Sequence, residues 1–246
     1  MNINIQNTMK EGNMRITFPN LIRWVRLSAM AAGIIFIVGL VAAIAFGGPT
    51  SPPEMASISN PFDTVDFSGL PPLLQYTAGD GAALAYRHYA PASGTVKGSV
   101  VLVHGSSANS KSMHALAKAF AAAGYDAYAL DIRGHGASGT KGRIDYIGQL
   151  EDDLSAFAGS VRLTKPATLV GFSSGGGFVL RVAGGPRQDA FQNYLLLSPF
   201  LSVDAPNARP GGGGWVNVGL PRIIALTILN RLGIRAFQDL PVTSFA

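Results

Sequence analysis

The sequence GFSSGGGF, at residues 171–178, decides the fold. It follows directly on ATLV, a mostly apolar run that predicts a buried strand over residues 167–172. The residues after it predict a helix that begins at Ser174. A Gly-x-Ser-x-Gly sequence between a strand and a helix is typical of a sharp turn that exposes the serine hydroxyl. The motif alone is weak in a chain with 30 glycines, so a nucleophile at Ser173 needs support from its surroundings.

Strand and helix patterns alternate on both sides of this motif, which indicates an α/β domain. The run VVLV at residues 100–103 fits a strand that is buried on both faces. Apolar residues at helical spacing predict amphipathic helices near residues 110–124 and 147–161. The expected strands are at residues 73–77, 83–89, 98–104, 126–131, 167–172 and 193–198.

Three motifs occur in an order that resembles the α/β-hydrolase family. They are VVLVHGSSANS from residue 100, YDAYALDIRGHGASG from residue 125 and LVGFSSGGG from residue 169. The most similar branch is that of the monoglyceride lipases, lysophospholipases and S33 serine aminopeptidases. The resemblance covers residues 73–200 and implies a serine hydrolase with a mostly parallel sheet and helices on both faces. The chain departs from that branch at Phe172, where histidine is common.

The resemblance also implies roles for individual residues. Ser173 would be the catalytic nucleophile, and the backbone N–H groups of Ser106 and Ser174 would form the oxyanion hole. Such donors act on charge that develops only in the transition state. His104 and His135 would stabilise loops rather than act as general bases, in keeping with their position in glycine-flanked turns.

The partners that should activate the serine are harder to find. In this fold the acid and then the histidine follow the nucleophile along the chain, yet no histidine follows Ser173. Asp204, six residues past the strand at residues 193–198, is a candidate acid, although it reads more simply as a loop residue at the start of a cap. A third interpretation gives the base role to His104 or His135, which would then have to leave its turn.

The part of the chain after the sixth strand is expected to begin a cap. Residues 201–246 would form its start, and residues 221–232 predict an apolar helix with proline near its beginning. Ending the sheet at its sixth strand would leave an apolar edge exposed. We therefore expect an α/β-hydrolase fold that is incomplete after the sixth strand, as in a truncated product, a gene fragment or a frame-shifted form.

Residues 27–46 predict a transmembrane helix. This stretch has no charged residue, and its 20 residues span about 30 Å, the thickness of the hydrocarbon core of a bilayer. A buried core helix seldom stays apolar on every face for so long. A cleaved signal peptide remains an alternative, with Ala43-Ile44-Ala45 as its exit, but its apolar region should be shorter, about 7–15 residues.

Flanking charge predicts the orientation of this helix. Arg23 and Arg26 precede it, and no lysine or arginine follows until Arg87. The positive-inside rule then places the N-terminus in the cytoplasm and the rest of the chain outside the cell (inner) membrane. The predicted division is a basic tail (1–26), a signal-anchor (27–46), a proline-rich linker (47–72), a hydrolase core (73–200) and the start of a cap (201–246).

The function expected from these features is a membrane-anchored serine hydrolase. It would cleave carboxylic esters of lipid, lysophospholipid or acylglycerol type through an acyl-enzyme, although soluble esters or peptides fit the residues equally well. The alternative is a truncated or inactive relative with a binding role or none. No cysteine is present, the glycines at residues 175–177 lack the lysine of a phosphate-binding loop, and no basic stripe occurs. We therefore expect no cofactor, no metal and no nucleic acid partner.

Overall fold

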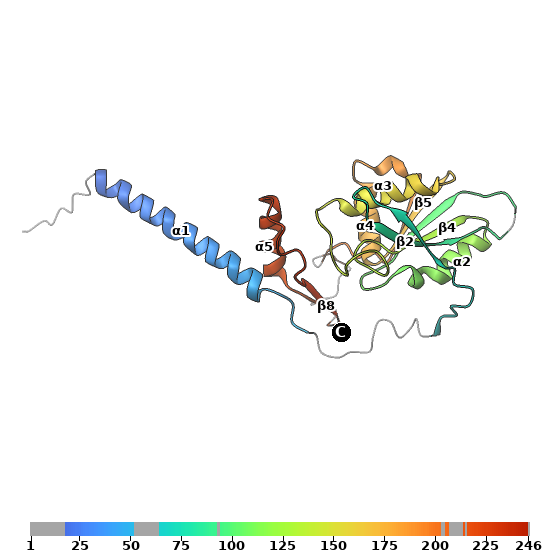
Figure 1. Cartoon of the computed structure of the whole chain (residues 1–246), viewed down its shortest axis with the longest axis horizontal. Coiled ribbons are helices and arrows are strands. Elements are labelled where there is room, and N and C mark those ends of the chain that lie inside the picture. Colours follow the sequence, from blue (N-terminus) through green and yellow to red (C-terminus); the bar gives the residue numbers. More distant parts are fainter. Residues whose placement is uncertain are drawn as a thin grey trace, which may run out of the picture.

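The computed structural model describes residues 18–51, 64–92, 94–202, 205–206, 214 and 216–245. Figure 1 shows three parts: the long helix α1, a small unit at the C-terminal end of the chain, and a larger unit built around a sheet. We call residues 64–202 the core unit and residues 216–245 the C-terminal unit. The core unit lies beyond the end of α1, and the C-terminal unit lies next to that end (Figure 1).

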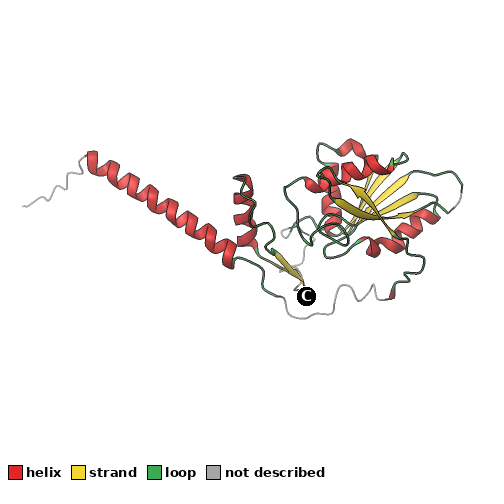
Figure 2. Cartoon of the chain, viewed as in Figure 1, coloured by secondary structure: helices red, strands yellow, loops and turns green. Residues whose placement is uncertain are grey.

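The core unit is a sheet with helices, coloured by type in Figure 2. Its elements along the chain are β1 (Leu73–Thr77), β2 (Ala83–Tyr89), β3 (Ser99–Val103), a 3-10 turn (Ser110–Met113), α2 (His114–Ala122), β4 (Asp126–Leu130), α3 (Gln149–Val161), β5 (Ala167–Phe172), α4 (Ser174–Ala183), a 3-10 turn (Gln188–Ala190) and β6 (Asn193–Leu197). All six predicted strands are present within one residue at each end. The prediction of an α/β-hydrolase fold is confirmed.

The strand order in the sheet is β1-β2-β4-β3-β5-β6. The strands β4, β3, β5 and β6 run parallel, and β1 and β2 form an antiparallel hairpin at one edge. Because the four parallel strands point the same way, the residues that follow β3, β4 and β5 all lie at the same carboxyl edge of the sheet. Ligands of open α/β sheets bind at this edge.

The central strand β3 is buried on both faces, as its unbroken apolar run predicts. Val101 and Val103 pack in one cluster with side chains from α3 and α4, among them Phe157 and Val179. Val100 and Leu102 pack in a second cluster with Ala117 and other residues of α2. The alternation of side chains along a strand thus divides the core into one layer on each face of the sheet.

Helix α1 runs from Phe18 to Phe46. It begins earlier than the apolar run because Pro19 can stand in the first turn of a helix and no breaker separates it from residue 27. The helix is long and apolar enough to cross a membrane over Leu21–Phe46, with a mean hydropathy of 2.7. None of that window is buried in the rest of the chain, which does not fit a core helix.

The C-terminal unit consists of one helix between two short strands. These are β7 (Val216–Val218), α5 (Leu220–Arg231) and β8 (Thr243–Phe245), and the two strands pair antiparallel. Pro221 stands in the first turn of α5, as expected. The helix packs against the C-terminal end of α1. The division of the chain into five parts, including a cap over residues 201–246, stays a prediction.

Candidate active site

Ser173 occupies the turn between β5 and α4, as the motif predicts. Its backbone angles are φ 54° and ψ −119°, a conformation that costs a non-glycine residue on the order of 1–3 kcal/mol. Four hydrogen bonds hold it there. Ser173 N donates to Leu197 O at 3.0 Å, and Ser173 O accepts from the N–H groups of Gly176, Gly177 and Phe200 at 2.9, 3.2 and 2.8 Å. The strained backbone conformation of Ser173 is therefore held in place by hydrogen bonds to the backbone of α4 and to the backbone at and just after the end of β6.

The two glycines of the motif allow a close approach of backbone segments. A Cβ on Gly175 would collide with the main-chain carbonyls of Val103 and His104 at the end of β3. A Cβ on Gly171 would lie 2.7 Å from Gly176 N, in the first turn of α4. Since the obstacles are backbone atoms, neither position can take a side chain without a shift of the turn.

The loop after β3 lies next to the serine. A Cβ built on Gly105 would be 3.2 Å from Ser173 Cβ. The predicted oxyanion donors are in this region: Ser106 follows Gly105, and Ser174 is the first residue of α4. Among the described residues, neither backbone N–H has a hydrogen-bond partner. Two N–H groups beside a strained serine, one of them at the positive end of a helix, can donate hydrogen bonds to an anionic oxygen.

Two exposed apolar residues lie close to the turn that holds the serine. Phe172 precedes it in β5 and is 38% exposed, and Phe200 is 48% exposed. Both are fixed close to the turn, because Phe200 N donates to Ser173 O and a Phe172 ring atom lies 3.5 Å from the Cβ position of Gly105. Two exposed aromatic residues close to the Ser173 turn add apolar surface to the candidate site.

No base is joined to the serine in the described part of the chain. The Ser173 hydroxyl has no hydrogen-bond partner there. Both ring nitrogens of His104 are engaged: Nδ1 donates to Gly105 O at 2.7 Å, and Nε2 accepts from Ile132 N at 3.3 Å. Burial lowers the pKa of His104 to about 4, so the ring is neutral at pH 7. It ties the loop after β3 to the loop after β4, which is the loop-stabilising role expected of it.

His135 also belongs to the loop after β4. Its Nδ1 lies 3.3 Å from Arg133 O, and its ring centroid lies 5.1 Å from that of His104. Asp131 anchors the same loop, because its carboxylate accepts from Ser110 N at 2.6 Å and from Ala137 N at 2.8 Å. No hydrogen bond connects either histidine with Ser173 among the described residues, and the third interpretation gains no support from the geometry.

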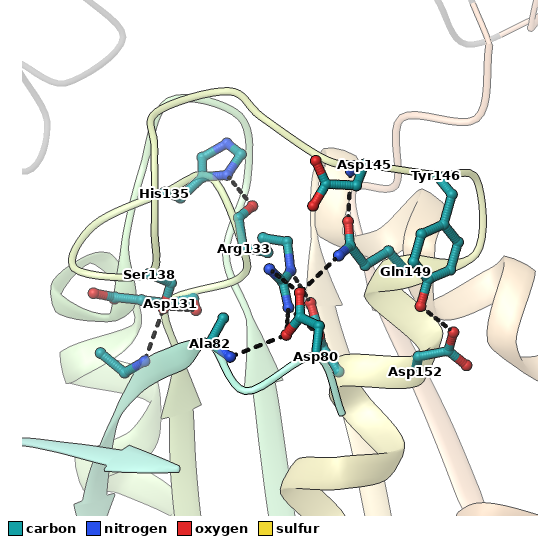
Figure 3. Close-up of polar contacts among 12 residues, drawn as sticks. Asp80, Ala82, Asp131, Arg133, His135, Ser138, Asp145, Tyr146, Gln149 and Asp152 are labelled. Carbon is teal, nitrogen blue, oxygen red and sulfur yellow. Dashed lines mark hydrogen bonds and ion pairs between the residues drawn. The ribbon is translucent and has the colours of Figure 1, made fainter. Parts of the chain in front are cut away.

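A charged network that the motifs did not reveal fixes the rest of this loop (Figure 3). Arg133 donates to both carboxylate oxygens of Asp153 in α3, at 2.7 and 2.8 Å, and to Asp80 in the turn between β1 and β2, at 3.0 Å. Gln149 Nε2 donates to Asp80 at 3.2 Å, and Gln149 Oε1 accepts from Asp145 N at 2.6 Å. The network connects three elements that meet at the carboxyl edge of the sheet.

Charge and hydrogen bonding in this network shift two pKa values. Hydrogen bonds to Asp153, and then to Asp80, raise the pKa of Arg133 above its usual range. The hydrogen bond from Arg133 holds the pKa of the Asp80 carboxyl below its usual value. Arg133 and Asp153 are both nearly buried, so each depends on the other for a charge partner.

The remaining predicted site residue, Asp204, lies outside the described residues. Within the described ranges, no group of three histidine, aspartate or glutamate side chains could hold a metal ion. The candidate site therefore consists of Ser173, the two backbone donors and the apolar rings beside them, with the general base and acid unassigned.

Comparison with known proteins gives the same family. The family model described as serine aminopeptidase, S33 matches residues 94–239. A monoacylglycerol lipase of Mycolicibacterium smegmatis is 36% identical over 119 residues, which are 47% of this chain and 40% of that protein.

Solved structures with a similar fold include a soluble variant of the monoglyceride lipase of Saccharomyces cerevisiae in complex with a substrate analogue. It is 25% identical, with a TM-score of 0.45, and the match covers 55% of this chain and 47% of that one. A putative aryl esterase from Burkholderia cenocepacia is 22% identical, with a TM-score of 0.46 and coverage of 56% and 52%. The chain thus spans about half the length of the proteins it matches.

Proposed function

The chain belongs to the serine aminopeptidase, S33 family of α/β-hydrolases, and from this membership we propose that it is a membrane-anchored serine hydrolase that cleaves lipid esters of monoacylglycerol or lysophospholipid type. The family is one of hydrolases, and the chain is similar to a lipase. The observation that carries the proposal is the strained Ser173 between β5 and α4, beside two backbone N–H groups that have no hydrogen-bond partner among the described residues.

The proposed reaction follows from this geometry. Ser173 Oγ attacks the ester carbonyl as its proton passes to a general base, and the carbonyl oxygen becomes an oxyanion that accepts from Ser106 N and Ser174 N. Loss of one such donor reduces the rate by roughly 10²–10³-fold. The tetrahedral intermediate expels the alcohol and leaves an acyl-serine, which water then hydrolyses. Asp204 is the candidate acid of this reaction.

The substrate class rests on two observations. The exposed rings of Phe172 and Phe200 offer an apolar surface to an acyl chain next to the nucleophile. The similar protein from M. smegmatis is a monoacylglycerol lipase. Because the chain covers only part of that relative, its substrate is proposed rather than transferred from it.

The proposed anchor is α1, which places the active site near a source of lipid. Arg23 and Arg26 keep the N-terminus in the cytoplasm by the positive-inside rule, so the core unit lies outside the inner membrane. Of the five predicted parts, residues 27–46 then form the uncleaved anchor and residues 47–72 the linker to the core. The start of the cap, residues 201–246, follows the sixth strand.

Fluorophosphonate labelling of the full chain in detergent tests the nucleophile. We expect labelling of the wild-type protein and none of Ser173→Ala, while the matched control Ser174→Ala, which keeps its backbone N–H, stays labelled. Hydrolysis of p-nitrophenyl esters should follow the same pattern. Persistent labelling of Ser173→Ala contradicts the assignment.

A second candidate function is the binding of esters without hydrolysis, by a chain that is a catalytically inactive relative of the family. The observation that favours it is the lack of any hydrogen bond from the Ser173 hydroxyl to a described residue. A folded wild-type protein that takes no label and hydrolyses p-nitrophenyl esters no faster than Ser173→Ala would rule out the proposed hydrolase in favour of an inactive relative.

A further inference from the structure

The backbone carbonyl groups at the C-terminal end of α1 are capped by the side chain of a residue that is distant in sequence. The last carbonyl groups of a helix have no partner within it. Here the guanidinium of Arg222, in the first turn of α5, donates to Ile44 O at 2.9 Å and to Ala45 O at 3.1 Å. A third hydrogen bond goes from the same group to Pro241 O at 2.8 Å, just before β8.

Arg222 lies at the position where a positive charge stabilises α1 most. Its side chain is 8% exposed, and it stands at the negative end of the α1 dipole, which favours positive charge. Its own backbone N–H donates to Gly47 O at 3.2 Å. One residue thus connects the end of α1, the start of α5 and the approach to β8 into a single joint.

Three glycines make the joint compact. A Cβ on Gly219 would lie 2.7 Å from Gly47 O, and a Cβ on Gly47 would lie 2.8 Å from Pro221 Cβ. A Cβ on Gly48 would collide with the Arg222 guanidinium. Close backbone approach at three positions on two segments indicates a specific contact between α1 and α5.

The two helices also share an apolar seam. Among residues 21–46, the residues of intermediate burial are Leu40, Ala43 and Ile44, which lie on one face near the end of α1. On α5, Ala225 and Leu229 are buried. Their spacing of four residues places them on one face of the helix.

The C-terminal unit also has exposed apolar side chains. Its exposed large apolar side chains are Val218, Leu220, Ile224, Leu232, Ile234 and Phe237, and those of Leu220 and Ile224 lie on the face of α5 opposite Ala225 and Leu229. Figure 1 shows that α5 turns back from the end of α1 toward the side on which α1 lies, while the core unit lies on the other side of that end. If α1 spans a bilayer, α5 is therefore on the bilayer side of its own joint.

We propose that α5 is a second membrane contact: Arg222 holds it against the end of α1, and its exposed apolar side chains enter the same leaflet of the bilayer. The inference rests on the proposed anchoring role of α1. The occupant of the apolar surface is lipid, because this surface continues the apolar surface of α1. Arg231, at the end of α5, is exposed and can meet lipid phosphates as long cationic side chains do at an interface.

Site-specific fluorescence in vesicles tests this inference. The chain has no cysteine, so single cysteines can be introduced at Ile224, Leu232 and, within α1, Ile35 in the full-length protein. Each is labelled with an environment-sensitive dye and reconstituted in phosphatidylcholine vesicles that carry doxyl quenchers near the headgroups or near the bilayer centre. Leu180, an apolar residue on α4 with exposure similar to that of Ile224, is the matched control.

We expect quenching at Ile224→Cys and Leu232→Cys by the shallow quencher, at Ile35→Cys by the deep quencher, and none at Leu180→Cys. Quenching at Ile35 without any at Ile224 and Leu232 overturns the inference and leaves the anchor intact. No quenching at Ile35 shows instead that the anchor itself is wrong. A dye shift at Ile224 without quenching by either lipid indicates burial against a second protein copy and also overturns it.

The joint is tested with Arg222→Met, which keeps the length of the side chain and removes its donors. We expect loss of quenching at Leu232→Cys, with quenching at Ile35→Cys unchanged. Arg222→Lys should not restore it, because one ammonium cannot reach three carbonyl oxygens in a fixed fork. Unchanged quenching at Leu232→Cys in the Arg222→Met background shows that Arg222 does not position α5.

Discussion

Two neighbouring segments at the carboxyl edge of the sheet are held by different means. The turn at residues 171–177 is fixed by backbone hydrogen bonds and by glycines that pack against other backbone. The loop at residues 131–149 is fixed by charged side chains, above all Arg133 between Asp153 and Asp80. Adding a side chain anywhere in the first segment should therefore destabilise the fold. The stability contributed by the second segment should instead depend on particular side chains and on pH.

The largest effect is expected from a side chain in the turn. In Gly175→Val, the new side chain collides with the carbonyls of Val103 and His104, which cannot rotate away. We expect a loss of about 4 kcal/mol or more in the free energy of unfolding, or no folded protein. Urea unfolding measures it. Gly79→Val, at a turn with open space around it, is the control, and equal losses for the two variants would contradict the backbone argument.

Removing the central charge of the loop should come next. Arg133→Met leaves the carboxylate of Asp153 nearly buried without a partner, which costs about 3–5 kcal/mol for such pairs. Arg143 pairs with Asp145 on the surface, so the control Arg143→Met should change stability by at most about 1 kcal/mol. Urea unfolding of both variants checks the contrast. Similar losses in the free energy of unfolding for Arg133→Met and Arg143→Met would show that the Arg133 pair contributes no more than an ordinary surface ion pair.

The pH dependence of stability separates His104 from the charged network. The pKa of His104 is about 4 in the folded chain and about 6.5 when unfolded, so the unfolded chain binds more protons between these values. Stability should then rise by about 3 kcal/mol from pH 4 to pH 6.5 and stay level above that. His104→Gln should flatten this rise in urea unfolding at a series of pH values, and a slope that persists in the variant refutes the assignment.

Asp80 acts in a lower pH range. The hydrogen bond from Arg133 lowers its pKa below 3.8, so its contribution is present above that pH and is lost as the pH falls through the folded value. The rise between pH 4 and pH 6.5 should therefore survive in Asp80→Asn. This variant is the control for His104→Gln.

The smallest expected effect is an increase in stability. Gly159 lies in α3 with nothing near its Cβ position, so Gly159→Ala should stabilise the chain by about 0.5–1 kcal/mol through helix propensity. The same change at Gly177 in α4 meets the carbonyl of Phe200 and should destabilise it. Thermal unfolding of the two variants gives the signs, and a gain at both positions would mean that α4 has room to move away from Phe200.

The turn could be predicted from the sequence, whereas the loop network could not. Strand β5, Ser173 and helix α4 are adjacent in the chain, and their pattern is local. Arg133 finds its partners 20 and 53 residues away, so the pairing depends on how α3 and the hairpin turn meet the sheet. The contact of Arg222 with the end of α1 spans 178 residues. Its only sign in the sequence is one arginine in the first turn of a mostly apolar helix.

The contacts of the C-terminal unit on its two sides differ in their sensitivity to ionic strength. Toward α1 it is held by the buried Arg222, which salt screens little. Toward the core unit the charged contacts are Arg143 with Asp239 at 3.3 Å and Arg235 over the Tyr146 ring at 6.0 Å, and the first of these pairs is exposed. Exposed ion pairs contribute at most about 1 kcal/mol and weaken in salt. Salt concentration should thus loosen the contact of the C-terminal unit with the core unit while leaving its contact with the end of α1 in place.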